Sequence, residues 1–463
     1  MLAPFRGLRY APDRVSGLAE VTSPPYDGIG SGSVPRLLAA DPHNVVRLIL
    51  PQADPVTGAD PGRVAADTLS AWVTQRVLAP DPRPAMYIYE QSTGAAGAPG
   101  QVLQRGIIGA VQLSPPGAGI VLPHEDVVPG PVQGRRELME ATQANLEPIF
   151  LLYDGSPAGL RAQAAAGAGT TGAGTTGGVA ADTDQGGAAS GDHRGATIRL
   201  VDKIAAAARP LLTAVTEDGI THRLWAVTDP AEQAAIAADL APRQALIADG
   251  HHRYAAYLEL QERQHAAGAQ AGPWDYGLAL LIDSAAYPPR IGAMHRVIPG
   301  LAPADAVALA KAAFTVRALP PGLPAALHEL AQTGRDGAAF LLAGGDGSLH
   351  LLDQPDAVQA AQAMPADRSA AWRALAPSVL QELLIRQIWQ IEDAREAVQV
   401  VHQDAVAAIR AAAEAGGTAV LCNPVSADDV RDVAARGERM PPKSTSFGPK
   451  ARTGLLLRRF ADG

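Results

Sequence analysis

The sequence of 463 residues contains one cysteine, Cys422, and few aromatic residues, which make up 4% of the chain. A single thiol cannot form an internal disulfide, and alone it cannot build a metal site of several thiolates. Cys422 ends the apolar run Thr418–Cys422. Because short apolar runs of this kind are typical of buried strands, we interpret this cysteine as a core residue rather than a reactive one.

Long apolar stretches are also missing from the sequence. No run approaches the roughly 18 apolar residues that a membrane-spanning helix needs. The N-terminal residues Met1–Arg6 contain no apolar segment of the length that a secretory signal peptide requires. We therefore expect a cytoplasmic protein without a membrane partner.

Clusters of Lys and Arg are absent as well, and the chain has a formal net charge of -9 and a pI near 5.7. An acidic chain is repelled by phosphate backbones unless a local basic patch offsets its charge, so no nucleic-acid partner is expected. Hydrophobic residues make up 47% of the chain and charged residues 18%, which is enough apolar material for a folded core. The oligomeric state is not predicted.

Short apolar runs rich in β-branched residues alternate with segments of helical periodicity along most of the chain. This alternation predicts an α/β or α+β fold with a mixed sheet, flanking helices and two packed lobes. The expected strands are 86–89, 106–111, 146–153, 222–227, 244–248, 276–282, 292–297, 418–422 and 455–457, and the expected helices are 63–77, 230–240, about 251–265, 379–393, 403–414 and 427–436.

Gly155–Ala196 interrupts this pattern, since it consists almost entirely of Ala, Gly, Thr, Ser and Asp. Such a segment cannot bury enough side chain to offset its ordering entropy. We expect a flexible, disordered insertion with no catalytic part. The predicted organisation is an N-terminal α/β lobe (1–154), the insertion (155–196), a segment with a conspicuous polar motif (197–300) and a C-terminal α/β lobe that completes the site (301–463).

The polar motif is Ala248–Tyr254, which follows an expected strand and begins an expected helix. Asp249 is a favourable N-cap residue, and Gly250 allows a ligand to approach the backbone closely. The N–H groups and the dipole at the start of a helix favour an anion. Three further donors suited to phosphate oxygens follow the glycine, namely His251, His252 and Arg253.

Three readings of this motif stay open. In the first, the donors bind phosphate and Asp249 holds Mg²⁺ through its carboxylate. In the second, the segment is an ordinary capped helix whose His and Arg side chains face solvent. A zinc site is the weakest reading, because adjacent histidines on a helix point about 100° apart and rarely share one ion.

The loop Lys443–Lys450 places two lysines and three hydroxyls within eight residues. Lysines supply charge to phosphoryl oxygens, and hydroxyls can bind phosphate or Mg²⁺. The loop is not a Walker A motif, since its glycine spacing is wrong. We interpret Lys443, Ser444, Thr445 and Lys450 as cofactor-binding, with an ordinary polar loop as the alternative.

Glu125 follows His124 and precedes a Pro/Gly-rich turn. A loop carboxylate beside a histidine can act as a general base towards a hydroxyl, although a solvated pair is the alternative. The candidates for substrate binding are polar residues in short motifs elsewhere: Asp27, His124, Arg135, Asn145, His295 and Arg296.

Four blocks together resemble the DUF1015 family, whose activity is undefined. They are 23–27; 124–125 with 135–138, 141–145 and 148–153; 248–254; and 440–450. The Asp-Gly-His-His-Arg sequence at 249–253 is also similar to a motif of ParB-like free serine kinases, so we describe 197–300 as a ParB-like segment. The second resemblance implies that the motif grips nucleotide phosphates while an acidic residue activates the serine hydroxyl.

The sequence therefore predicts a phosphotransferase, kinase-like or phosphatase-like, that acts on a small hydroxylated metabolite, with serine or phosphoserine as the best candidate. ATP or ADP and Mg²⁺ are the expected cofactors. Asp249 is expected to bind Mg²⁺, Glu125 to act as base, and His251 and His252 to serve at the catalytic centre. Two alternatives are kept: a non-catalytic nucleotide-binding regulator related to ParB, and a metal-assisted hydrolase.

Overall fold

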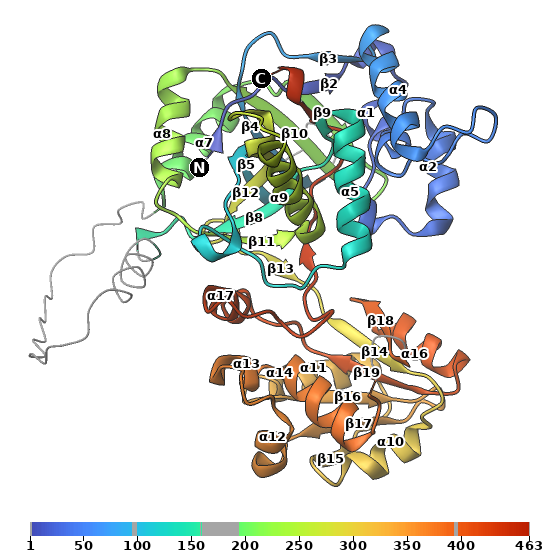
Figure 1. Cartoon of the computed structure of the whole chain (residues 1–463). Coiled ribbons are helices and arrows are strands. Elements are labelled where there is room, and N and C mark those ends of the chain that lie inside the picture. The colour runs from blue at the N-terminus through green and yellow to red at the C-terminus, as the bar shows by residue number, and fades with distance from the viewer. Residues whose placement is uncertain (1, 95–99, 158, 160–193, 393–396, 463) are drawn as a thin grey trace, which may run out of the picture. The chain divides into compact units, whose positions relative to one another are not determined.

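The computed structural model describes residues 2–94, 100–157, 159, 194–392 and 397–462 (Figure 1). Most of the predicted disordered insertion lies outside these described residues. The chain divides into two compact units. Unit 1 comprises Met1–Val121, Val127–Pro288 and Pro449–Gly463, and unit 2 comprises Leu122–Asp126 and Pro289–Gly448.

Unit 1 is built on a nine-stranded sheet. One pair, between β12 and β8, is parallel, while the neighbouring pairs on both sides are antiparallel, so the sheet is mixed. All five residues of β8 are buried, as expected of a strand covered on both faces. In sheet order the strands are β6 (Val121–Leu122), β11 (Ala245–Asp249), β8 (Ile149–Tyr153), β12 (Tyr276–Asp283), β5 (Val102–Gln112), β4 (Met86–Thr93), β10 (Ile220–Val227) and β9 (Leu212–Val215), with β1 (Leu2–Ala3) on β5.

Helices cover this sheet, and α9 contacts both α5 and the strands β8 and β12 (Figure 1). Its buried face includes Tyr254, Tyr257 and Leu260, which join the same core cluster as the strand residues Ile149 and Ile247. The longer helices of unit 1 are α4 (Pro61–Thr74), α5 (Pro129–Thr142), α7 (Ala196–Ala207), α8 (Pro230–Leu240) and α9 (His251–Ala266). Shorter elements are α1 (Leu18–Val21), α2 (Val34–Ala40), α3 (Val46–Ile49), the pair β2 (Leu8–Tyr10) and β3 (Leu78–Pro80), and the pair β7 (Ala144–Asn145) and β21 (Arg458–Arg459).

Unit 2 contains a six-stranded sheet whose paired strands are antiparallel. One face packs Val297, Leu341 and Leu421 against alanines of α11 and α16. The strands in sheet order are β15 (Thr315–Ala318), β17 (Leu349–Asp353), β16 (Phe340–Ala343), β19 (Thr418–Cys422), β14 (Met294–Ile298) and β18 (Gln399–His402). The remaining elements are α10 (Pro303–Ala310), α11 (Leu323–Thr333), α12 (Ala357–Ala363), α13 (Ala370–Ala374), α14 (Ala376–Ser378), the π-helix η6 (Val379–Ile388), α16 (Ala405–Glu414), α17 (Ala427–Ala435), and the pair β13 (Arg290–Ile291) and β20 (Phe447–Gly448).

The predicted fold class, α/β or α+β with a mixed sheet, is confirmed. The expected strand at 455–457 is wrong. Leu455 and Leu456 lie outside any strand, and Leu457 forms only an isolated bridge with Leu8. All three leucines are buried, so the apolar run marked core packing rather than a strand. The structure contains no helix, within its described parts, that is both long and apolar enough to span a bilayer.

A buried histidine of β10 is expected to make unit 1 sensitive to acid. His222 is 3% exposed, and its ring nitrogens hydrogen bond to the Tyr89 hydroxyl at 2.8 Å and to Thr216 Oγ1 at 3.1 Å. Burial, with a smaller contribution from Arg452, lowers the pKa of His222 to about 4. Between its ordinary pKa, about 6.5, and 4, the unfolded chain binds a proton that the folded chain does not.

The stability of unit 1 should therefore fall by about 3 kcal/mol as the pH drops from 6.5 to 4, at 1.36 kcal/mol per pKa unit. Urea unfolding at several pH values measures this slope. The stability of the His222→Gln variant should depend less on pH over that window, because glutamine does not take up a proton there. Equal slopes in the wild type and His222→Gln would show that another group causes the acid sensitivity.

Candidate functional site at the start of helix α9

The junction between β11 and α9 is a tight turn at Gly250. This residue has φ +95°, and a Cβ atom there would lie 3.0 Å from Ile149 Cγ2 and 3.1 Å from Arg253 Nε. Glycine is favoured because it alone adopts this backbone conformation readily and adds no side chain. The N-cap residue of α9 is Gly250, and no side chain caps the helix. The N-cap role predicted for Asp249 is therefore wrong.

The Asp249 carboxylate instead belongs to a group of four charged side chains, which we call the α9 cluster: Asp27, Asp249, Arg253 and Lys450. Arg253 Nη2 hydrogen bonds to Asp249 Oδ2 and lies 4.0 Å from Asp27 Oδ2. Lys450 Nζ lies 2.5 Å from Asp249 Oδ1 and 3.2 Å from Asp27 Oδ1. Residues from three separate sequence motifs thus meet within unit 1.

The pKa values of three members of the α9 cluster are shifted in the direction that favours the charged form. Burial opposes the charge of Arg253, but Asp249, Glu147 and Asp27 raise its pKa overall. The pKa of Lys450 is likewise lowered by burial and raised on balance by Asp249 and Asp27. For Asp27, burial raises the pKa, while Arg253 and Lys450 lower it more. The cluster therefore contains two carboxylates and two cations whose charges cancel.

The arrangement suits a hard divalent cation that arrives with phosphate. The Lys450 ammonium already bridges carboxylate oxygens of Asp27 and Asp249, so both acids can face one cation. Mg²⁺ is commonly held by one or two carboxylates together with waters and substrate phosphates. No group of three or more His, Cys, Asp or Glu side chains converges within the described residues. Asp27 and Asp249 therefore fit a metal shared with a ligand rather than one enclosed by protein.

A small pocket in unit 1 adjoins the α9 cluster through Arg253. The cavity volume is about 20 Å³, which is room for one or two waters. Two residues predicted to bind substrate, Arg135 and Asn145, line it. The complete lining is Arg135, Leu138, Met139, Asn145, Leu146, Glu147, Arg253 and Tyr257.

The pocket contains an acid that the sequence reasoning missed, Glu147. Its side chain is 4% exposed, accepts a hydrogen bond from the Tyr26 backbone N–H at 2.9 Å, and lies 3.9 Å from Arg135 Nη1. Burial raises the pKa of Glu147, although Arg253 and Arg135 oppose this. Arg135 also lies over the Tyr26 ring at 4.3 Å. In the sequence, Glu147 is marked only as an acidic residue within the apolar stretch that leads into β8.

The two histidines of the motif start α9. His251 is buried, while the Nε2 atom of His252 accepts a hydrogen bond from the Val128 backbone N–H at 3.1 Å. A backbone N–H can only donate, so Nε2 of His252 is unprotonated in this bond and the ring proton lies on Nδ1. The catalytic roles of both histidines stay predictions.

Glu125 and His124 lie in unit 2, where they meet the loop of residues 443–446. The Thr445 hydroxyl donates to Glu125 Oε1 at 3.0 Å and lies 2.9 Å from His124 Nε2. Since a hydroxyl has one proton, His124 Nε2–H is the donor in the second bond. Ser444 donates to the carbonyl oxygen of Pro441 at 2.7 Å.

The predicted site residues are thus distributed over both units. Lys443 belongs to unit 2 and Lys450 to unit 1, although they are seven positions apart in the sequence. His295 and Arg296, in unit 2, are both buried on β14. Unit 1 holds the other predicted residues: Asp27, Arg135, Asn145, Asp249, Gly250, His251, His252, Arg253 and Lys450. The α9 cluster is the part of the predicted site that the structure brings together most closely.

Comparison with known proteins identifies a family and distant structural likenesses. A family described as "Protein of unknown function (DUF1015)" matches residues 2–186 and 187–376. No curated protein matches the chain.

Three of the similar solved structures are a mutant free serine kinase in complex with ADP (12% identity, 71% of this chain and 84% of that chain, TM-score 0.32), C-terminally truncated SbnI from Staphylococcus aureus (11%, 76% and 88%, TM-score 0.34) and a conserved hypothetical protein from Pyrococcus furiosus (13%, 71% and 87%, TM-score 0.29). Likenesses with TM-scores this low carry no argument about function.

Proposed function

The chain belongs to the DUF1015 family, and we propose that it is a phosphotransferase whose phosphate chemistry is centred on the α9 cluster. The observation that carries this proposal is the Lys450 ammonium, which lies between the carboxylates of Asp27 and Asp249 at the start of α9. These side chains bring together the acids and cations that phosphoryl transfer needs. Such transfer depends mainly on positioning and on neutralising charge.

The α9 cluster offers a separate role to each of its members. Asp27 and Asp249 would hold Mg²⁺, which supplies positive charge to the phosphates of ATP or ADP when bound. Lys450, displaced from the two carboxylates by the metal, would then neutralise a phosphoryl oxygen. Arg253 would keep Asp249 in place, because it is buried and also donates to the Pro148 carbonyl oxygen at 2.6 Å. The turn at Gly250 would let phosphate approach the positive end of the helix.

The side chains of the neighbouring pocket are suited to a small substrate that carries one positive and one negative charge. Arg135 and Glu147 place a cation and an anion on one wall, 3.9 Å apart. These groups are complementary to the carboxylate and ammonium of an amino acid such as serine or phosphoserine. Because the pocket holds only one or two waters, its side chains would have to move apart to admit such a ligand. The general-base role of Glu125, which belongs to unit 2, stays a prediction from the sequence.

The proposal is tested by phosphorus NMR of the purified protein with Mg²⁺, ATP or ADP, and serine or phosphoserine. We expect the nucleotide and phosphoserine resonances to interconvert only when both Mg²⁺ and the second substrate are present. Lys450→Met should abolish this turnover, whereas Lys203→Met, which removes an exposed lysine of α7, should not.

Three other outcomes would contradict the proposed phosphotransferase activity. Tight nucleotide binding without turnover would favour the regulator, and release of phosphate from phosphoserine without nucleotide would favour the metal-assisted hydrolase. A lack of both binding and turnover for all these mixtures would overturn the proposal.

A further inference from the structure

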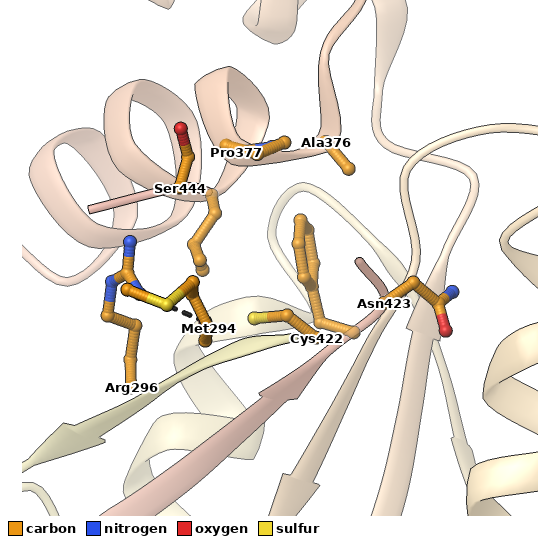
Figure 2. Close-up of a pocket in the computed structure, with 9 residues that line it drawn as sticks. Met294, Arg296, Ala376, Pro377, Cys422, Asn423 and Ser444 are labelled. Atoms are coloured by element: carbon orange, nitrogen blue, oxygen red, sulfur yellow. Dashed lines mark hydrogen bonds between the residues drawn. The ribbon is translucent and has the colours of Figure 1, made fainter. Parts of the chain in front are cut away.

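A second small cavity lies wholly within unit 2, on the face of the six-stranded sheet opposite the packed alanines of α11 and α16. Alternate residues of a strand share a face, so Met294 and Arg296 of β14 lie on one side and Val297 on the other. Figure 2 shows Met294 and Arg296 below Ala376 and Pro377. The cavity is lined by Met294, Arg296, Phe340, Ala376, Pro377, Leu380, Cys422, Asn423 and Ser444, and it offers about 20 Å³ to the centre of a water molecule.

The charged member of this lining, Arg296, is 5% exposed, and its hydrogen bonds all go to backbone carbonyl oxygens. Nη1 donates to Met294 O at 2.9 Å and His295 O at 3.5 Å. Nη2 donates to Lys443 O at 2.9 Å and Pro442 O at 3.3 Å. The hydrogen bonds of the guanidinium to described residues are those of its Nη1 and Nη2 atoms. No carboxylate of the described residues forms a salt bridge with this guanidinium.

The cavity therefore contains a buried positive charge without a counter-ion from the described chain. No Asp or Glu lines it, and its other ionisable side chain is Cys422. Burial raises the pKa of the Cys422 thiol to about 11, against a smaller opposing effect of Arg296, so the thiol is neutral at pH 7. Burial also lowers the pKa of Arg296, but a guanidinium stays protonated in proteins. A buried charge is costly unless an opposite charge accompanies it.

We propose that this cavity binds one small monovalent anion of the size of chloride, held against the guanidinium of Arg296. A charge of -1 balances the arginine, and the volume admits little more than one or two waters. A larger anion, such as phosphate, would require the lining side chains to move apart. The site is separate from the α9 cluster, since all of its lining residues belong to unit 2.

The anion would act on the loop that carries three of the predicted cofactor residues. Arg296 Nη2 holds the carbonyl oxygens of Pro442 and Lys443. Ser444, the next residue, lines the cavity. An anion that stabilises the charged guanidinium therefore also stabilises residues 442–444 in their present conformation.

The direct test is to soak crystals of the full-length protein in sodium bromide and locate bromide by anomalous scattering. In solution, urea unfolding is followed while chloride replaces gluconate, a bulky anion, at constant ionic strength. Above the dissociation constant, each tenfold rise in chloride should shift the folding equilibrium of the wild type tenfold, because only the folded state binds. Arg296→Met should abolish this dependence, while Cys422→Ser should retain it.

The same two experiments are repeated with added bicarbonate, the other small anion that could occupy the site. If bicarbonate binds there, it should displace the bromide density in the crystals and reproduce the effect of chloride on unfolding. The proposal of a small-anion site holds in either case. It is overturned if the cavity contains only water in bromide-soaked crystals, or if bromide binds there but chloride has no effect in solution, which would mean an adventitious ion only. An equal chloride dependence in Arg296→Met would also overturn it. If that variant does not fold, the crystals of the wild type decide.

Discussion

Replacing Asp249 with asparagine is expected to lower the free energy of unfolding of unit 1 by about 3–5 kcal/mol, the usual cost of removing one partner from a buried ion pair. The Arg253 side chain is 5% exposed and that of Asp249 12% exposed. Asparagine keeps the shape of the side chain but removes its charge, so the Arg253 guanidinium loses its closest carboxylate. Asp27, 4.0 Å away, is too distant to replace it with a hydrogen bond.

Asp27→Asn provides the matched comparison, because Asp27 pairs with the same lysine but is 33% exposed. Its loss should cost about 1 kcal/mol or less, as for partly solvated ion pairs. Urea unfolding, followed by tryptophan fluorescence, to which Trp72, Trp225 and Trp274 of unit 1 contribute, measures both effects. Equal losses for the two variants would show that Arg253 does not depend on Asp249. A double replacement, Asp249→Leu with Arg253→Met, should recover part of the stability, because no buried charge is then left unpaired.

Much of the local structure could be predicted because the hydrophobic pattern sets it. The helix expected at 230–240 and the strand expected at 418–422 have those bounds in the structure. The strand-to-helix junction at Gly250 also follows from the sequence, since an apolar run meets a glycine there. Local periodicity predicts such elements well because neighbouring residues determine them.

The partners of charged residues depend on contacts that are distant in the sequence, and these were not predictable. Lys450 pairs with Asp27, 423 positions away, and with Asp249. Asp249 was expected to cap α9, but a buried arginine and a lysine attract its carboxylate more strongly than backbone N–H groups do. Between Lys443 and Lys450 the chain passes from unit 2 to unit 1, at Gly448 and Pro449, and the sequence pattern does not indicate this boundary.

A substitution of Glu125 tests catalysis more sharply than a substitution of Asp249, whereas a substitution of Asp249 tests the structure more sharply. Substitution of Asp249 disturbs a buried ion pair as well as any metal site, so lost activity in that variant has two causes. The Thr445 hydroxyl donates one hydrogen bond to Glu125, and glutamine can still accept that bond. Glu125→Gln therefore changes the proton affinity of the side chain while leaving its contact to Thr445 intact.

Under the proposed function, Glu125→Gln should lower kcat by about 100- to 10,000-fold, the range expected for loss of a general base, with the KM for nucleotide unchanged. Initial rates with Mg²⁺, nucleotide and serine measure this. Glu125→Asp is the control, since it keeps a carboxylate that can take up a proton. If Glu125 acts as the base, Glu125→Asp should retain far more activity than Glu125→Gln. If both variants lose activity equally and unfold at lower urea, Glu125 holds the loop in place and is not the base.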